Sequence, residues 1–307
     1  MFHYRLCGLS FSAVVPLPGA TALDDAPGTP DVLLQRRAVP HRLESPLGHG
    51  PGWEMDGNRL LLTLPDSGRF MASDGRTLDI DPAADIDDIM PFVLGTGIGA
   101  LLYQRGGMVL HGATVEVDGG GITLCGFGGT GKSTLAAALC RSGCRLVGDD
   151  LAALSLGAPG EGPLVQPDGQ HLKLYDTTIA RLGMTAQSGP AVRRGLSKHY
   201  VTAPAAVSAP VPLKAVYVLH DSPRGKATSF DRLPPLVAAQ ALLNQSYRRR
   251  LALTTARLDS RSAALRDAVL RRVPLFRLSR PRDLDRLDEV AGAVLAHVRG
   301  LEERALS

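Results

Sequence analysis

Residues 126–133 read GFGGTGKS, and this stretch decides the fold because it matches the phosphate-binding pattern G-x-x-x-x-G-K-[ST] at every fixed position. The apolar stretch Ile122–Cys125 before it predicts a strand, and the Ala- and Leu-rich stretch Ser133–Ser142 after it predicts a helix. Glycines allow the backbone to turn its N–H groups inward, and the helix N-terminus adds a partial positive charge. The sequence therefore predicts a strand–loop–helix unit that binds a nucleoside triphosphate.

Two side chains of this loop have expected tasks. Lys132 is expected to reach the β- and γ-phosphates, and the hydroxyl of Ser133 to coordinate Mg²⁺. The predicted cofactors are thus ATP and Mg²⁺. The residues expected to bind the nucleotide are Gly126, Phe127, Gly128, Gly129, Thr130, Gly131, Lys132, Ser133 and Thr134.

Three more polar residues accompany the loop. Asp149 and Asp150 close the predicted strand Arg145–Val147. His111 follows the predicted strand Met108–Leu110. A kinase that acts on a hydroxyl group needs a carboxylate for the metal ion and a base beside the acceptor. Two adjacent carboxylates can divide these tasks, since consecutive strand residues point in opposite directions.

Outside the loop, the chain separates into two parts. Residues 1–105 are rich in turn signals and short alternating stretches, which predicts a mostly antiparallel β module that ends in a helix. Residues 106–307 predict an α/β nucleotide-binding catalytic domain, with a mixed sheet and flanking helices. The first part is expected to have strands at Arg59–Leu64, Arg69–Ala72 and Thr77–Ile80 and a helix from Ile86 to Gln104. The second is expected to add strands at Ala113–Val117 and Val216–Leu219, helices at Pro234–Asn244 and Asp285–Arg304, and loops at 157–170 and 203–212.

Composition narrows the function classes. Hydrophobic residues make up 44% of the chain and charged residues 21%, which indicates a folded globular protein. The net charge of +4 suits an anionic ligand, but no spaced aromatic platform accompanies it, so we expect no nucleic-acid partner. We expect no membrane span, because no run of about 18 apolar residues occurs. Four cysteines without a CxxC pair fit reduced thiols in the cytoplasm.

A known family shares this arrangement of motifs. The residues VLHG at 109–112, the loop at 126–133 and LVGDD at 146–150 together resemble the catalytic core of HPr kinase/phosphorylase. That core is similar to phosphoenolpyruvate carboxykinase more than to ordinary kinases with this loop. The resemblance implies an ATP-dependent phosphotransferase with a phosphoenolpyruvate-carboxykinase-like fold.

The same resemblance implies roles for individual residues. It makes Asp149 the catalytic base and His111 its neighbour. Lys132 is the third catalytic residue. The resemblance also places Asp150 and Ser133 on the metal side. The bifunctional enzyme also has a signature E-x-R-G-x-G after the acid pair, where this chain has HLKLYD at 171–176. Transfer to an acceptor is therefore expected rather than the reverse reaction.

The whole chain resembles another branch of that family. YRLCGL at 4–9, LKLY at 172–175 and Lys198 are similar to the HPr-kinase homologues of lasso-peptide gene clusters. This implies a serine kinase whose partner is a precursor peptide, phosphorylated at its C-terminal Ser. Lys173 and Lys198 are then candidates for contacts with substrate or phosphate.

Two other functions are compatible with the sequence. One is a small-molecule hydroxyl kinase, and the other is a non-catalytic nucleotide-binding regulatory protein. The basic run Arg248–Arg250 is interpreted as a solvated surface. Whether the chain forms a homo-oligomer is left open.

Overall fold

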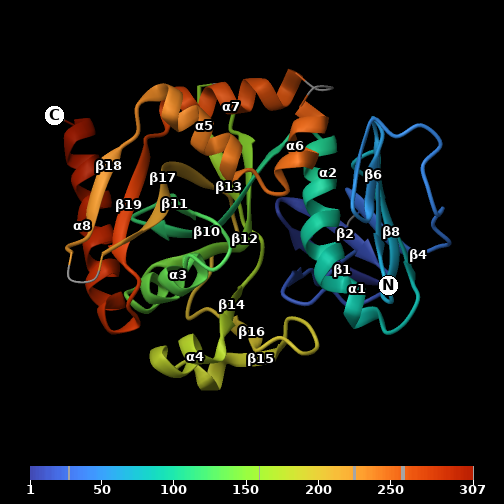
Figure 1. Ribbon diagram of the computed structural model, residues 1–307, viewed down its shortest axis with the longest axis horizontal. Helices are drawn as coiled ribbons and strands as arrows, with labels where there is room; N and C mark the ends of the chain where they lie inside the picture. The colour runs from blue at the N-terminus through green and yellow to red at the C-terminus, as the bar shows by residue number, and fades with distance from the viewer. Residues whose placement is uncertain (27, 159, 224–225, 257–259, 307) are drawn as a thin grey trace.

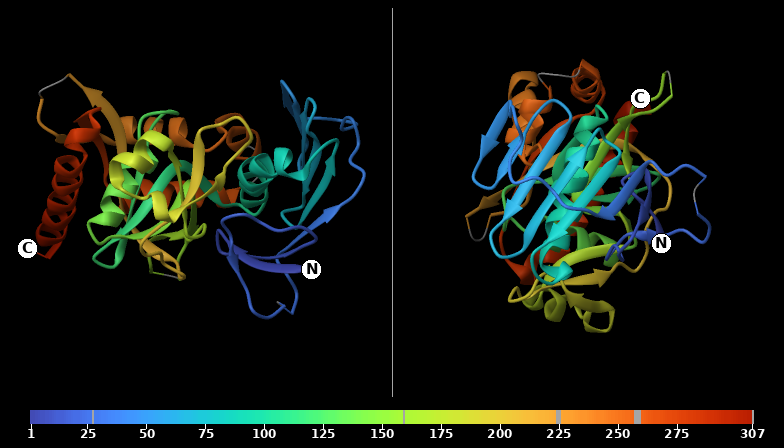
Figure 2. Two further views of the ribbon diagram at one scale, coloured as in Figure 1. Left: turned by 90° about the horizontal axis from the view of Figure 1, so that it is seen from below. Right: turned by 90° about the vertical axis from the view of Figure 1, so that its right-hand side faces the viewer.

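The computed structural model describes residues 1–26, 28–158, 160–223, 226–256 and 260–306. Within these ranges the chain forms a mixed α/β protein with three sheets (Figure 1). The largest sheet stands at the end of the molecule that carries the N-terminus, and the C-terminal helix lies at the opposite end (Figure 2). This confirms the expected α/β class.

The first sheet uses residues up to Pro82 and has the strand order β3-β1-β2-β4-β9-β8-β7-β6-β5. Its neighbours are antiparallel except for the pairs β2–β4 and β4–β9. The strands are β1 (Phe2–Leu6), β2 (Leu9–Ala13), β3 (Thr21–Ala22), β4 (Val32–Arg36), β5 (Gly48–Gly50), β6 (Trp53–Met55), β7 (Arg59–Leu64), β8 (Gly68–Ser73) and β9 (Thr77–Pro82). The three strands expected in this part are confirmed as β7, β8 and β9.

A continuous helical stretch follows, as expected from Ile86 to Gln104. It consists of α1 (Ile86–Phe92), a π-helical segment (Val93–Gly97) and α2 (Ile98–Gln104). By length and composition alone this stretch could cross a membrane, but 67% of its most apolar window is buried in the fold, as in the core helix of a soluble protein.

Glycines in this stretch make room for one aromatic ring. A Cβ atom on Gly95 would lie 2.5 Å from the Tyr247 hydroxyl, and one on Gly99 would lie 3.1 Å from the Tyr247 ring. The hydroxyl of Tyr103 donates a 2.6 Å hydrogen bond to the backbone carbonyl of Tyr247. The helical stretch therefore fixes the position of Tyr247, far along the chain.

The second sheet has the order β11-β10-β12-β13-β17-β19-β18. Its strands are β10 (Met108–Val117), β11 (Gly120–Cys125), β12 (Arg145–Leu156), β13 (Pro163–Gln166), β17 (Val211–Ser222), β18 (Ser229–Arg232) and β19 (Leu275–Pro281). Because β17 also pairs with β11, five of these strands close into a ring.

Three sequence expectations for this sheet are corrected. β10 is one strand that contains His111, not two short strands on either side of it. β12 does not end at Asp149 and Asp150, because the apolar residues Leu151–Leu154 continue the ladder with β10. β13 lies inside the expected loop 157–170.

Helices cover both faces of the second sheet (Figure 1). Alternate residues of β17 face opposite ways: Tyr217 packs in the cluster with α3 and α8, and Val218 in the cluster with α5 and α7. The helices are α3 (Lys132–Arg141), α5 (Pro235–Gln245), α6 (Arg249–Ala256), α7 (Ser260–Arg272) and α8 (Leu287–Leu306). The expected helices at 133–142, 234–244 and 285–304 are confirmed to within a few residues as α3, α5 and α8.

A small third sheet lies below the second one in Figure 1. Its order is β14-β16-β15, and α4 accompanies it. The elements are β14 (His171–Tyr175), α4 (Asp176–Leu182), a short 3₁₀ turn (Thr185–Gln187), β15 (Ser188–Ala191) and β16 (Lys198–Thr202). Another 3₁₀ turn, Leu284–Arg286, comes directly before α8. This sheet brings Lys173 and Lys198, from β14 and β16, toward the glycine-rich loop.

Candidate active site

The glycine-rich loop joins β11 to α3. Gly126, Gly129 and Gly131 have φ angles of 154°, 79° and 84°. Residues other than glycine rarely adopt these φ angles. A Cβ on Gly126 would also lie 2.6 Å from the hydroxyl of Thr130. The Thr130 hydroxyl instead donates to the carbonyl of Phe127. The loop therefore needs its glycines for its turns, and Thr130 holds it from within.

Lys132 stands at the start of α3 and is 7% exposed. Its ammonium group donates to the carbonyls of Gly126 at 2.9 Å and Phe127 at 3.2 Å. Burial lowers the pKa of this ammonium group. The charge thus lies within the hollow of the loop, where it can meet a phosphate oxygen.

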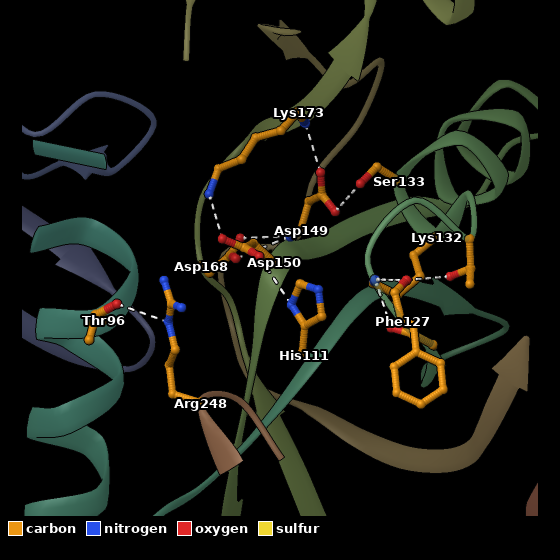
Figure 3. A network of polar contacts seen from close by, with 12 residues as sticks. Thr96, His111, Phe127, Lys132, Ser133, Asp149, Asp150, Asp168, Lys173 and Arg248 are labelled. Carbon is orange, nitrogen blue, oxygen red and sulfur yellow. Dashed lines mark hydrogen bonds and ion pairs between the residues drawn. The ribbon is translucent and has the colours of Figure 1, made fainter. Parts of the chain in front are cut away.

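The two carboxylates of the acid pair have different partners (Figure 3). Asp149 is 4% exposed and accepts hydrogen bonds from the Ser133 hydroxyl at 2.8 Å and from the backbone N–H of Lys173 at 2.7 Å. Asp150 lies 3.1 Å from the Lys173 ammonium group and 3.2 Å from Nδ1 of His111. The neighbour of His111 is therefore Asp150, and not Asp149 as the family resemblance implies.

Neighbouring positive groups keep the carboxyl group of Asp150 ionised. Burial alone would raise the pKa of its carboxyl group, but Lys173 and His111 hold this pKa well below its usual range. Burial would lower the pKa of Lys173, and Asp150 instead raises it. Asp150 also has a φ of 97°, so its backbone departs from strand geometry. The pair therefore exists as carboxylate and ammonium.

A third carboxyl group, Asp168, lies behind the acid pair. Its two oxygens accept from the backbone N–H of Asp149 at 3.2 and 3.1 Å. Burial raises its pKa well above the usual range, and the nearby charge of Asp149 acts in the same direction. A Cβ on Gly148 would lie 2.5 Å from Cγ of Asp168. The glycine before the acid pair therefore makes space for Asp168, which the sequence analysis did not single out.

Arg280 is a second residue that the sequence analysis missed. It comes from β19, is 5% exposed, and donates from its guanidinium group to the carbonyl of Thr130. Asp221 lies 3.6 Å from the same guanidinium group. Arg280 thus fixes the loop from outside and adds positive charge beside it.

Two cavities meet at the acid pair. The first, of about 640 Å³, has a lining that includes most of the loop, Thr134 and Arg280, and we call it the nucleotide cavity after the ligand expected there. The second, of about 630 Å³, has a lining that includes Gly126, Phe127 and Arg248, and we call it the acceptor cavity after the substrate expected there. Residues that line both are His111, Gly128, Asp150, Lys173 and Lys198. Of the acid pair, Asp149 lines the first cavity but not the second.

The donor set beside the loop fits Mg²⁺. The Ser133 hydroxyl and the Asp149 carboxylate are two oxygen donors within hydrogen-bonding distance of each other. Mg²⁺ is typically bound by one or two protein oxygens together with water and phosphate oxygens. Among the described residues no group of three or more His, Cys, Asp or Glu side chains could hold a metal ion without such help.

Comparisons with known proteins do not establish the function of this chain. No family model and no curated protein matches the chain. Among solved structures, the HPr(Ser) kinase/phosphatase from Coxiella burnetii aligns with 65% of this chain and 99% of its own, at 12% identity and a TM-score of 0.34. A TM-score this low supports no conclusion about function, so the proposed function rests on the residues of the site.

Proposed function

We propose that this protein is an ATP-dependent kinase that transfers the γ-phosphate to a hydroxyl group. The observation that supports this best is the position of Asp150 and His111 on the boundary of the two cavities. A nucleotide bound on the loop would present its γ-phosphate from one side, and an acceptor would approach from the other. Phosphoryl transfer requires this in-line approach of the attacking and leaving oxygens.

The contacts favour a division of the acid pair opposite to the one that the family resemblance implies. Asp149, bonded to Ser133, is assigned to hold Mg²⁺ together with that hydroxyl. Mg²⁺, when bound, supplies positive charge to the β- and γ-phosphate oxygens. Asp150, which also lines the acceptor cavity, is assigned to the acceptor hydroxyl.

The low pKa of Asp150 keeps it ionised, so it accepts a hydrogen bond from the acceptor hydroxyl and aims its oxygen at phosphorus. The acceptor oxygen forms a bond to the γ-phosphorus while the bond to the β–γ bridging oxygen breaks, and ADP leaves. As the new bond forms, the acceptor oxygen becomes far more acidic than the free hydroxyl, so its proton moves to Asp150 late in the step and from there to water. Lys132 stabilises the charge that grows on the phosphate oxygens.

The proposed acceptor is a serine hydroxyl of a peptide, with the C-terminal Ser of a lasso-peptide precursor as the first substrate to test. The acceptor cavity includes Arg193, Lys198 and Arg248 in its lining, which suits an anionic acceptor. The proposed location is the cytoplasm; the four cysteines are free and buried, which is compatible with a reducing compartment.

The test uses purified protein, Mg-ATP and a lasso-peptide precursor that ends in Ser, compared with the same peptide ending in Ala. We expect a gain of one phosphate in the mass of the Ser peptide alone, and none with Lys132→Ala. Turnover of small alcohols without any gain on Ser-ending peptides would instead identify a small-molecule kinase. Mg-ATP binding without any transfer would identify a regulatory nucleotide-binding protein.

A further inference from the structure

A third hollow continues from the acceptor cavity. It has a volume of about 710 Å³ and lies between the first sheet, the helical stretch and α6. Trp53 and Leu62 contribute to an apolar wall on the sheet side, and Arg248–Arg250 line the opposite side. Phe92 and Arg248 line both this hollow and the acceptor cavity, so the two adjoin at these residues, and the acceptor cavity extends to Asp150. We call the third hollow the peptide groove.

Arg248 stands at the junction of the peptide groove and the acceptor cavity. Its φ is 47°, an angle that non-glycine residues rarely adopt and that costs of order 1 kcal/mol or more. The preceding residue is tied to β10: the N–H of Tyr247 donates to the carbonyl of Val109 at 2.8 Å, two residues before His111. The structure thus holds Arg248 in a strained conformation beside the candidate active site.

The guanidinium group of Arg248 is held by hydrogen bonds, but no carboxylate of the described residues pairs with its charge. Its Nε donates to the Thr96 hydroxyl at 3.1 Å, its guanidinium group also donates to the Tyr247 hydroxyl, and its Cζ lies 5.8 Å from the centre of the Tyr247 ring. Within the described part of the chain it forms no ion pair. Figure 3 shows Arg248 reaching toward the helix that carries Thr96, and Arg248 lines the same cavity as His111. Its remaining N–H donors are available for a planar anion such as a carboxylate.

We propose that the peptide groove binds an extended segment of the acceptor peptide, and that Arg248 binds the free carboxylate of the residue whose hydroxyl is phosphorylated. This inference rests on the proposed kinase function. The apolar wall can bury side chains of the segment, and the guanidinium group of Arg248, where the groove meets the acceptor cavity, complements the anionic chain end. The fork of an arginine pairs with both oxygens of a carboxylate, so the enzyme would select a terminal serine over an internal one.

The test compares two pools of synthetic decapeptides with randomised apolar positions. Both end in Ser, one with a free carboxylate and one with a C-terminal amide. For the wild-type protein we expect amidation to lower kcat/KM by about 10- to 100-fold, the usual value of a hydrogen-bonded charge. Arg248→Gln should lower transfer to the acid pool by a similar factor, and amidation should then have little further effect.

Arg250→Gln is the matched control, because Arg250 lines the groove but not the acceptor cavity. It should keep the wild-type preference for the acid pool. A dipeptide, N-acetyl-Ala-Ser, tests the groove, because it is too short to cover the apolar wall. Trp53→Ala should raise KM for the decapeptides by a larger factor than KM for the dipeptide.

The possible results separate the two claims. Equal transfer to acid and amide pools, or a full acid preference in Arg248→Gln, would overturn the role of Arg248 and leave the kinase assignment intact. Equal loss on both substrates in Trp53→Ala would overturn the groove assignment. Absence of Mg-ATP-dependent transfer to every peptide would overturn both the kinase proposal and this inference.

Discussion

Replacing Asp150 by Asn tests the assignment of the acceptor-side carboxylate. The substitution keeps the size of the side chain but removes the charge that lies 3.1 Å from Lys173 and 3.2 Å from His111. Without it the acceptor proton has no oriented base, so transfer should fall about 10²- to 10⁴-fold. This corresponds to roughly 3–5.5 kcal/mol of transition-state stabilisation. Binding of Mg-ATP, measured by calorimetry, should change little because Lys132 and the loop are untouched.

A loss of stability could imitate this result, because Asp150→Asn leaves the Lys173 ammonium group unpaired. Lys173 is 21% exposed at its side chain, so we expect this to cost about 1–3 kcal/mol in the free energy of unfolding. The double variant Asp150→Asn/Lys173→Met should recover the melting temperature but not the transfer. Near-wild-type transfer by Asp150→Asn would refute the reasoning. Loss of transfer with normal metal dependence in Asp149→Asn would restore the roles implied by the family resemblance.

Four other variants give shorter tests. Lys132→Ala should weaken Mg-ATP binding by about 2–4 kcal/mol, and unchanged affinity in calorimetry would remove the nucleotide assignment. Asp149→Asn should raise the Mg²⁺ concentration needed for half-maximal transfer, as a Mg²⁺ titration would show. Gly148→Ala should lower the melting temperature, because the added Cβ meets the Asp168 carboxyl group at 2.5 Å. Because burial raises the pKa of Asp168 in the folded state, its contribution to stability is complete below the unfolded-state pKa of about 4 and is lost as pH rises toward the folded-state pKa. Asp168→Asn, which imitates the neutral acid, should therefore flatten the decline of melting temperature above that pH; an unchanged pH profile would contradict this.

The sequence predicts the loop well because its geometry is local. Eight consecutive residues, 126–133, specify the turns, and the strand and helix around them follow from runs of apolar residues. The three strands from Arg59 to Pro82 are equally local, since the turn residues between them limit the register. The sequence also predicts the acid pair, because two adjacent carboxylates directly after an apolar run form a local pattern.

The partners of the acid pair could not be predicted in the same way. The register of β10 against β12 places Gly112 opposite Asp150, and this register includes a bulge at Thr114/Val115 that no local pattern indicates. The rule that consecutive strand residues alternate also fails at Asp150, whose φ of 97° departs from strand geometry. Asp168 and Arg280 reach the site from separate elements, so only the fold brings them to it.

The sequence divides into two parts near residue 105, but residues from both parts pack together beside the candidate site. One hydrophobic cluster includes residues of the first sheet, the helical stretch, β12 and Tyr247. Gly95 makes room for the Tyr247 ring, whose centre lies 5.8 Å from that of His111. The N-terminal part therefore contributes the sheet wall of the peptide groove, and its Thr96 hydroxyl accepts a hydrogen bond from Arg248. A bulky residue at Gly95 would therefore displace the acceptor side of the site, while the nucleotide loop, anchored on β11 and α3, would keep its geometry.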